Sequence, residues 1–323
     1  MRKQYHFSNS NNNTPETLLN GTLLWKKKDF LHQDHTSLPS SSTSFQFSEC
    51  TFANCYSETT GGAISLSNSG ASLSVDHSTF TGCNVPTSSD GNYGGAIYCT
   101  LCKSVTISSS SFVSCKSVKG GGIYLQEICQ FSSVDDSLFT QCSALGWGNG
   151  VVLWKLPQRN SGNTNSANTP LPASSNCRFL YNEYRVGTSG ALYFCPVNGA
   201  HTLRENLYSY NNANVYGGAV ECNLGGSYSV TTAVFHFSFF SNNNGNGNGD
   251  DVIILNNKYS ASSPFLHCFS TEESSTRLTS YQDSQYPHDI NWLPQTNANI
   301  KVIHPITTTD EISNHTNRYE NDN

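Results

Sequence analysis

Short alternating runs of apolar and polar residues recur along most of the chain, and they show no helical period. An aromatic residue stands at seven positions spaced 27 to 40 residues apart, and in six of these copies another apolar residue lies five positions earlier. The aromatic positions are Phe52, Phe80, Phe112, Phe139, Phe179, Tyr208 and Phe240. Alternation of Val, Ile, Thr, Phe and Ser between Gly, Asn and Ser turns is typical of short β-strands. The pattern predicts an all-β protein with several strands in each repeat.

Each repeat pairs two motifs. The first motif is Phe-x-x-Cys or Phe-x-x-Asn, and its fourth position is held by Cys55, Cys83, Cys115, Cys142, Asn182, Asn211 and Asn243. The second motif resembles Gly-Gly-Ala-Ile and supplies the glycines Gly62, Gly95, Gly122, Gly150, Gly190 and Gly218. Glycine in such a position indicates a corner that needs a positive φ or a close backbone approach. These recurring residues are therefore predicted to be structural.

A repeat of this length cannot bury its own apolar face, so the repeats must stack as they do in solenoids. We expect one right-handed parallel β-helix of about seven to nine rungs. Residues equivalent between rungs would then form ladders, with the aromatic residues in one buried stack and Ile64, Ile97 and Ile123 buried on a neighbouring strand. A β-propeller is the alternative fold. Its blades need about 40–45 residues, and most of the intervals here are shorter.

The combination of Gly-Gly-Ala-Ile with Phe-x-x-Asn resembles the repeats of chlamydial polymorphic outer membrane proteins and of similar protist surface proteins. The likeness covers roughly residues 45 to 255. It implies a right-handed parallel β-helix of the pectin-lyase-like class, display outside the cell or on its surface, and a role in adhesion. The chain departs from the family pattern in the Cys residues of its first four copies.

Three regions are expected along the chain. Residues 1–44 lack the motifs and would form an N-terminal cap or a degenerate rung, and residues 45–270 would form the β-helix. Residues 157–175 form an insertion rich in Ser, Asn, Thr and Pro, which is typical of an exposed loop. Residues 271–323 are expected to be a polar, disordered tail.

Charged residues make up 12% of the chain and the formal net charge is −6. This composition disfavours nucleic acid as a partner, because nucleic-acid-binding proteins concentrate Lys and Arg on one face. The chain contains no apolar run long enough for a membrane span and no readable signal peptide. A location at the cell surface is thus implied by the resemblance alone, and a cytoplasmic one stays open.

The 12 cysteines follow the repeats. Besides the four in the first motif, Cys99, Cys195 and Cys222 follow the second motif at a similar offset. A ladder of buried, reduced thiols is the favoured interpretation, and disulfides between neighbouring rungs are the alternative. Cys99 and Cys102 form a single Cys-x-x-Cys pair without a second pair nearby, so we expect no metal site. No cofactor is expected either.

The enzyme hypothesis depends on Asp250 and Asp251, which resemble the Gly-Asp-Asp motif of polygalacturonases. Glycoside hydrolysis needs two suitably spaced carboxylates, and the companion motifs Asn-Thr-Asp, Gly-His-Gly and Arg-Ile-Lys are absent. Asp135 and Asp136 are adjacent in a strand pattern, which would turn them to opposite faces. We therefore expect a non-catalytic binding or structural module that presents a β-helix face and the 157–175 loop to a protein or a glycan. The alternative is a polysaccharide lyase or glycosidase that uses Asp250 and Asp251.

Overall fold

Two-residue alternation of buried and exposed side chains marks the strands of this protein. In Ser72–Asp76, for example, Leu73 and Val75 are buried and the residues between them are only partly so. The computed structural model describes residues 14–17, 22–31, 38, 43–68, 70–128, 131–157, 173–183, 189–197, 199–214, 217–223, 231–236, 238–245, 252–255, 265–266, 269–270 and 278–281. Within these residues all regular structure is β, and no helix occurs.

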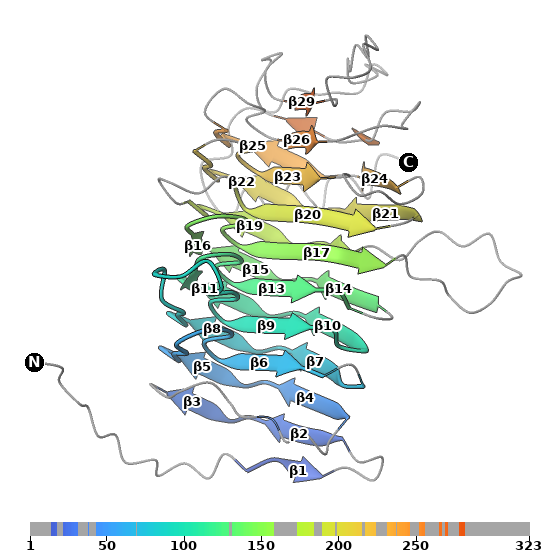
Figure 1. Ribbon diagram of the computed structural model, residues 1–323. Helices are drawn as coiled ribbons and strands as arrows, with labels where there is room; N and C mark the ends of the chain where they lie inside the picture. The colour runs from blue at the N-terminus through green and yellow to red at the C-terminus, as the bar shows by residue number, and fades with distance from the viewer. Residues whose placement is uncertain are drawn as a thin grey trace, which may run out of the picture.

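The strands form three long sheets and one short one (Figure 1). The first sheet contains, in spatial order, β1 (Glu16–Thr17), β2 (Leu23–Lys26), β4 (Ser44–Ser48), β7 (Ser72–Asp76), β10 (Ser104–Ser108), β14 (Phe131–Asp135), β18 (Ser174–Ser175), β21 (Gly199–Arg204), β24 (Thr231–His236) and β27 (Phe265–Leu266). The second contains β3 (Asp29–Leu31), β5 (Thr51–Ala53), β8 (Thr79–Thr81), β11 (Ser111–Val113), β15 (Leu138–Thr140), β19 (Arg178–Leu180), β22 (Leu207–Ser209), β25 (Phe239–Ser241) and β28 (Phe269–Ser270).

The third sheet contains β6 (Ile64–Ser67), β9 (Ile97–Thr100), β13 (Ile123–Gln126), β17 (Val151–Pro157), β20 (Leu192–Val197), β23 (Val220–Asn223), β26 (Val252–Leu255) and β29 (Leu278–Tyr281). The short sheet pairs β12 (Lys116–Ser117) with β16 (Ser143–Ala144). β1 pairs with β2 in antiparallel fashion, whereas successive strands of the long sheets otherwise pair in parallel.

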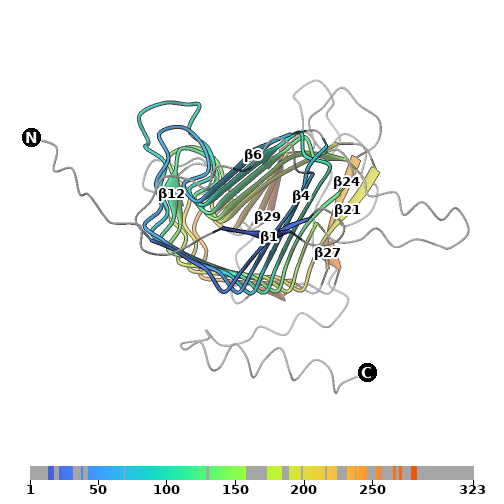
Figure 2. The same cartoon turned by 90° about the horizontal axis from the view of Figure 1, so that it is seen from below.

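Successive repeats each add a strand to the three long sheets, so equivalent residues fall into register. Viewed along the stack, the strands of each sheet lie over one another (Figure 2). Phe52, Phe80 and Phe112, for instance, are direct partners across β5, β8 and β11. This arrangement of parallel strands is compatible with the β-helix that the sequence predicts. It contradicts the alternative of antiparallel propeller blades.

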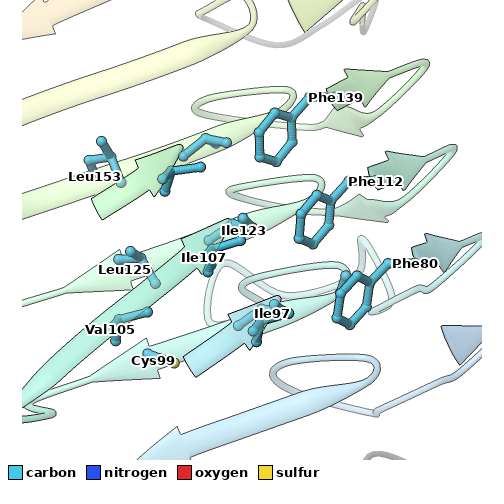
Figure 3. Packing of buried hydrophobic residues seen from close by; sticks show 14 of the residues in the cluster. Phe80, Ile97, Cys99, Val105, Ile107, Phe112, Ile123, Leu125, Phe139 and Leu153 are labelled. Carbon is cyan, nitrogen blue, oxygen red and sulfur yellow. The ribbon is translucent and has the colours of Figure 1, made fainter. Parts of the chain in front are cut away.

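The aromatic stack predicted from the sequence is confirmed. Rings of Phe52, Phe80 and Phe112 lie with centroids 4.6 and 4.7 Å apart and planes inclined by 2°, and the stack continues through Phe139 (Figure 3). Beyond it follow Phe179, Tyr208 and Phe240. Ile64, Ile97 and Ile123 are fully buried on the neighbouring sheet, as expected.

The second motif supplies the corner residues in two separate columns. Gly61 and Gly94 have φ values of 56° and 65°, and a Cβ on Gly62 or Gly95 would lie within 2.3 Å of a carbonyl oxygen in the next repeat. The sequence placed Gly122 and Gly150 with these two glycines, which is wrong. Ile123, which follows Gly122, pairs with Ile97, and Val151, which follows Gly150, pairs with Ile123. Gly122 and Gly150 therefore occupy the column of Ala63 and Ala96. That column needs a small residue because it faces the aromatic stack: a Cβ on Gly122 would meet the Phe139 ring at 3.2 Å.

The Cys and Asn residues of the first motif form one buried column. Cys115 Sγ donates to the Phe80 carbonyl of the preceding repeat at 3.6 Å, and Asn211 Nδ2 donates to the Phe179 carbonyl at 2.8 Å. The Cys and Asn side chains therefore donate to equivalent backbone carbonyls, which explains why either residue can occupy this position. Asn211 also donates to Asn243 Oδ1 at 3.0 Å, and this adds an amide ladder that thiols cannot build.

All ten cysteines in the described part of the chain are buried free thiols, as expected for a reduced ladder. Burial raises the pKa of Cys177 to about 12. Cys99 and Cys222 both point into the core. The expectation that Cys195 occupies the position equivalent to Cys222 is wrong. Cys222 pairs with Phe194, whereas Cys195 is the next residue along the strand and pairs with Trp154 on the outer face.

The stack includes strands from both terminal regions. β2 and β3 lie within the motif-free residues 1–44 and pair in parallel with β4 and β5. β29 lies within the segment 271–323 and pairs with β26. Residues 158–172 of the predicted insertion lie outside the described residues, as does most of the predicted tail. No helix in the described part of the chain has the length and hydropathy to cross a membrane.

Candidate functional site

The outer surfaces of the sheets differ in chemistry. On the first sheet the outward residues are mostly small and polar, and they bond to one another: Ser104 Oγ donates to Ser72 Oγ at 2.8 Å, and Ser108 Oγ donates to Asp76 Oδ1 at 2.8 Å. The third sheet instead carries a group of large aromatic side chains. We call this group the aromatic face; it consists of Tyr93, Tyr98, Lys119, Tyr124, Trp147, Val152, Trp154 and Tyr193.

Strand alternation turns the aromatic rings outward. Ile97, Ile123 and Leu192 point into the core, so the tyrosines that follow them point away from it. Tyr98 and Tyr124 are direct partners across β9 and β13. The next two strands continue this column with Val152 and Tyr193.

The turns before these strands contribute a second column. Tyr93, Lys119 and Trp147 each precede the first glycine of a corner, and their carbonyls accept hydrogen bonds from the equivalent glycine of the preceding repeat. The Gly94 amide donates to Lys119 O at 2.9 Å, and the Gly120 amide donates to Trp147 O at 2.9 Å. The corner geometry therefore fixes these side chains beside the tyrosine column.

The rings form two stacked groups. Tyr93 lies on Tyr124 with centroids 4.7 Å apart, and Tyr98 is 5.9 Å from Tyr124. Trp147 lies on Tyr193 at 4.9 Å and on Trp154 at 4.6 Å. Tyr124 and Tyr193 are buried, whereas the other four rings are partly exposed. The exposed edge of the face thus consists of Tyr and Trp rings.

Lys119 joins the two groups. Its ammonium lies 5.3 Å from the Tyr93 ring centroid and 4.4 Å from that of Trp147, within the range of cation–π attraction. Its positive charge is thereby held between rings. Burial raises the pKa values of Tyr98, Tyr124 and Tyr193, so their phenols stay protonated near neutral pH and can donate hydrogen bonds.

At the β23 end of the face a carboxyl group is buried. Glu221 pairs across the strands with Tyr193 and is only 4% exposed. Burial raises its pKa to about 7, and a hydrogen bond from the Ser189 hydroxyl opposes that rise. Among the described residues, Glu221 Oε2 has no hydrogen-bond partner. Neither Glu221 nor Ser189 was identified from the sequence.

Of the two carboxylate pairs considered for catalysis, the described residues contain only Asp135 and Asp136. Asp250 and Asp251 lie outside the described residues. Asp135 accepts from Ser175 Oγ and Asp136 accepts from Asn176 Nδ2, both at 2.6 Å, so each carboxylate is engaged by the next repeat. In the described part of the chain, no three metal-binding side chains converge. The 20 recurring residues of the two motifs lie in the ladders and corners described above.

The aromatic face was missed because its tyrosines belong to the same strands as the motif. The available signal is the alternation itself: in Ile97-Tyr98, Ile123-Tyr124 and Leu192-Tyr193 an inward aliphatic residue is followed by an aromatic one. Comparison with protein-family models and with curated protein sequences gives no match. The functional argument therefore depends on the geometry of the face.

Proposed function

We propose that this chain is a non-catalytic binding module built on a right-handed parallel β-helix, with the aromatic face as its contact surface. The observation that carries the proposal is the group of partly exposed Tyr and Trp rings on one outer face, where the first sheet presents Ser and Thr. Partly exposed aromatic clusters rimmed by polar residues mark interaction sites, and Tyr and Trp supply much of the binding energy at such sites.

The composition of the face favours an uncharged glycan over a protein. Gln126 and Asn223 are partly exposed on the same outer face and offer amide groups beside the rings. A sugar presents the complementary surface, with apolar C–H faces bordered by hydroxyls. The only described cation of the face, Lys119, already lies between two rings, so a strongly acidic glycan gains little there.

Two further elements belong to the proposal. The resemblance to surface repeat proteins supports a location outside the cell or on its surface. The predicted insertion begins at Pro157, the last residue of β17, which is the strand that carries Trp154. We propose it as a second, variable contact region.

The test is a binding screen with matched variants. Wild-type protein is titrated with cello-, xylo-, manno- and chito-hexaose and with polygalacturonate, while reducing ends and unsaturated products are monitored for turnover. The face variant Tyr98→Ser/Trp154→Ser is compared with Tyr181→Ser/Tyr210→Ser, which removes an exposed stacked pair with a centroid distance of 5.0 Å outside the aromatic face.

We expect wild type and the Tyr181/Tyr210 variant to bind a neutral oligosaccharide alike, and the face variant to lose about tenfold or more in affinity, which is about 1.4 kcal/mol. Equal binding by the face variant would remove the aromatic face from the account. Turnover of any substrate would contradict the non-catalytic assignment. If a protein bound through the same residues, the aromatic face would remain the contact surface, but its ligand would be a protein and not a glycan.

A further inference from the structure

Ser189 interrupts a regular feature of the corners. In three earlier repeats the first glycine of the corner donates its amide to a backbone carbonyl of the next repeat: Gly61 to Tyr93, Gly94 to Lys119 and Gly120 to Trp147. The Gly148 amide donates to the Ser189 hydroxyl at 2.9 Å. Ser189 stands where the other repeats have glycine, three residues before the aligned aliphatic Leu192. At this corner a side-chain hydroxyl accepts a hydrogen bond from the glycine amide.

The corner in question presents Trp147. Gly148 follows Trp147 directly, so the hydrogen bond from its amide helps to fix the direction of that indole. Trp147 in turn contacts Tyr193, Trp154 and the Lys119 ammonium. The position of the Ser189 hydroxyl therefore affects the position of Trp147 and, through it, the group of rings formed by Trp147, Trp154 and Tyr193.

Glu221 completes the chain of contacts. The fully buried Ser189 hydroxyl accepts from Gly148 and donates to the Glu221 carboxyl. Strand β20 presents Tyr193 to Glu221, and the nearby thiols are those of Cys195 and Cys222. Burial raises the pKa values of Tyr193 and Cys222, so these groups are neutral near pH 7. No cation of the described residues contributes to the electrostatics of Glu221.

We propose that Glu221 is a positioning residue of the aromatic face: through Ser189 it holds the turn that presents Trp147, and it does so in its protonated form. The inference rests on the proposed function of the face as a contact surface. Among the described residues, an ionised Glu221 carboxylate has one oxygen without a hydrogen-bond partner and no cation beside it, which is unfavourable in a low-dielectric surrounding. Ionisation therefore favours a local rearrangement that hydrates the carboxylate. The Ser189 hydroxyl bonds the carboxylate more strongly than the neutral acid, so it moves with the carboxylate and away from the Gly148 amide. The burial that raises the pKa of Glu221 to about 7 places this transition near neutral pH.

The experiment reads the position of Trp147 without any ligand. Exciton-coupled circular dichroism of the Trp147–Trp154 pair is recorded across the pH range around neutrality, with the far-UV β-sheet signal as the control for folding. Trp154→Phe serves as the blank, because it removes one partner of the pair. Wild type should lose exciton signal as pH rises, with a midpoint near 7. Glu221→Gln should keep the low-pH signal throughout, since the amide mimics the neutral acid. Ser189→Ala should have a reduced signal without that midpoint, because the link to Gly148 is gone.

A wild-type signal independent of pH, or the same midpoint in Glu221→Gln, would overturn the positioning role. Since no ligand is present, that failure would leave the proposed binding function untouched. Conversely, loss of glycan binding in the screen would not change the exciton profile. The two outcomes are thus separable.

Discussion

The interior of the stack and the aromatic face on its third sheet follow different rules. Inside, the same kind of residue returns in nearly every repeat, and consecutive rings from Phe52 to Phe240 are inclined by 10° or less. Outside, one column of aligned positions changes at almost every step. Its members are Ser65, Tyr98, Tyr124, Val152, Tyr193 and Glu221. Recurrence is explained by stacking, so the residues that break the recurrence are where function is to be sought.

The largest effect on stability is expected inside. Phe112→Ala removes a fully buried ring that stacks on Phe80 and Phe139, and truncation of a core aromatic costs about 3–5 kcal/mol. Urea denaturation should show this loss, with Phe112→Leu as the milder control because it retains part of the volume. A loss below about 1 kcal/mol would mean that the stack does not support the fold.

The next effect depends on pH. The pKa of Glu221 is about 7 in the folded protein against an ordinary value of 4.5, so the folded state binds more protons than the unfolded chain between these values. The contribution of Glu221 to stability should be fully present below about pH 4.5, fall by about 3 kcal/mol as pH rises to about 7, and then level off. Glu221→Gln should remove this contribution and stabilise the protein above neutral pH. Parallel unfolding curves of wild type and variant at several pH values would show whether the slope belongs to Glu221.

A smaller effect distinguishes the two halves of the Cys and Asn column. Asn211→Ala leaves buried partners at Phe179 and Asn182 without their hydrogen bonds, which should cost about 1–3 kcal/mol. Asn211→Cys should cost less than Asn211→Ala, because a thiol reaches the same carbonyl in earlier repeats. Thermal unfolding of both variants ranks them. If the alanine and cysteine variants were equally unstable, the thiol–carbonyl contact would have no energetic role.

The smallest effect on stability is expected on the aromatic face. Tyr98 and Trp154 are partly exposed, so Tyr98→Ser and Trp154→Ser should each change the unfolding free energy by about 1 kcal/mol or less. A fall as large as that of Phe112→Ala would show that the face serves the fold, and the contrast between interior and surface would disappear. Differential scanning calorimetry of the single variants suffices.

Sequence reasoning reached the interior because stacking forces a period on it. It missed Phe30, which stacks on Phe52 at 4.5 Å, because residues 29–33 lack the Phe-x-x-Cys motif. The spacing rule itself would have found it, since Trp25 lies five residues earlier and stacks on Phe47. Gly122 was misplaced because three consecutive glycines, 120 to 122, allow two alignments, and only the strand register decides between them.

The candidate site was less accessible to such reasoning. Glu221 and Ser189 are 32 positions apart and meet between neighbouring repeats. No local sequence pattern predicts their contact or the burial of Glu221. Strand alternation predicts that the tyrosines point outward, but it does not predict which residues lie beside them. Trp147 and Lys119 come from turns, and the position of those turns follows from the corner geometry.

Hydroxyl-radical footprinting, with and without the oligosaccharide selected in the binding screen, tests the central claim most directly, because aromatic side chains are oxidised where they are exposed. The account predicts that ligand protects Tyr98, Trp147 and Trp154 and leaves Tyr181 and Tyr210, which are 50% and 36% exposed, as reactive as before. Protection of Tyr181 and Tyr210, with Tyr98 and Trp154 unchanged, would contradict it.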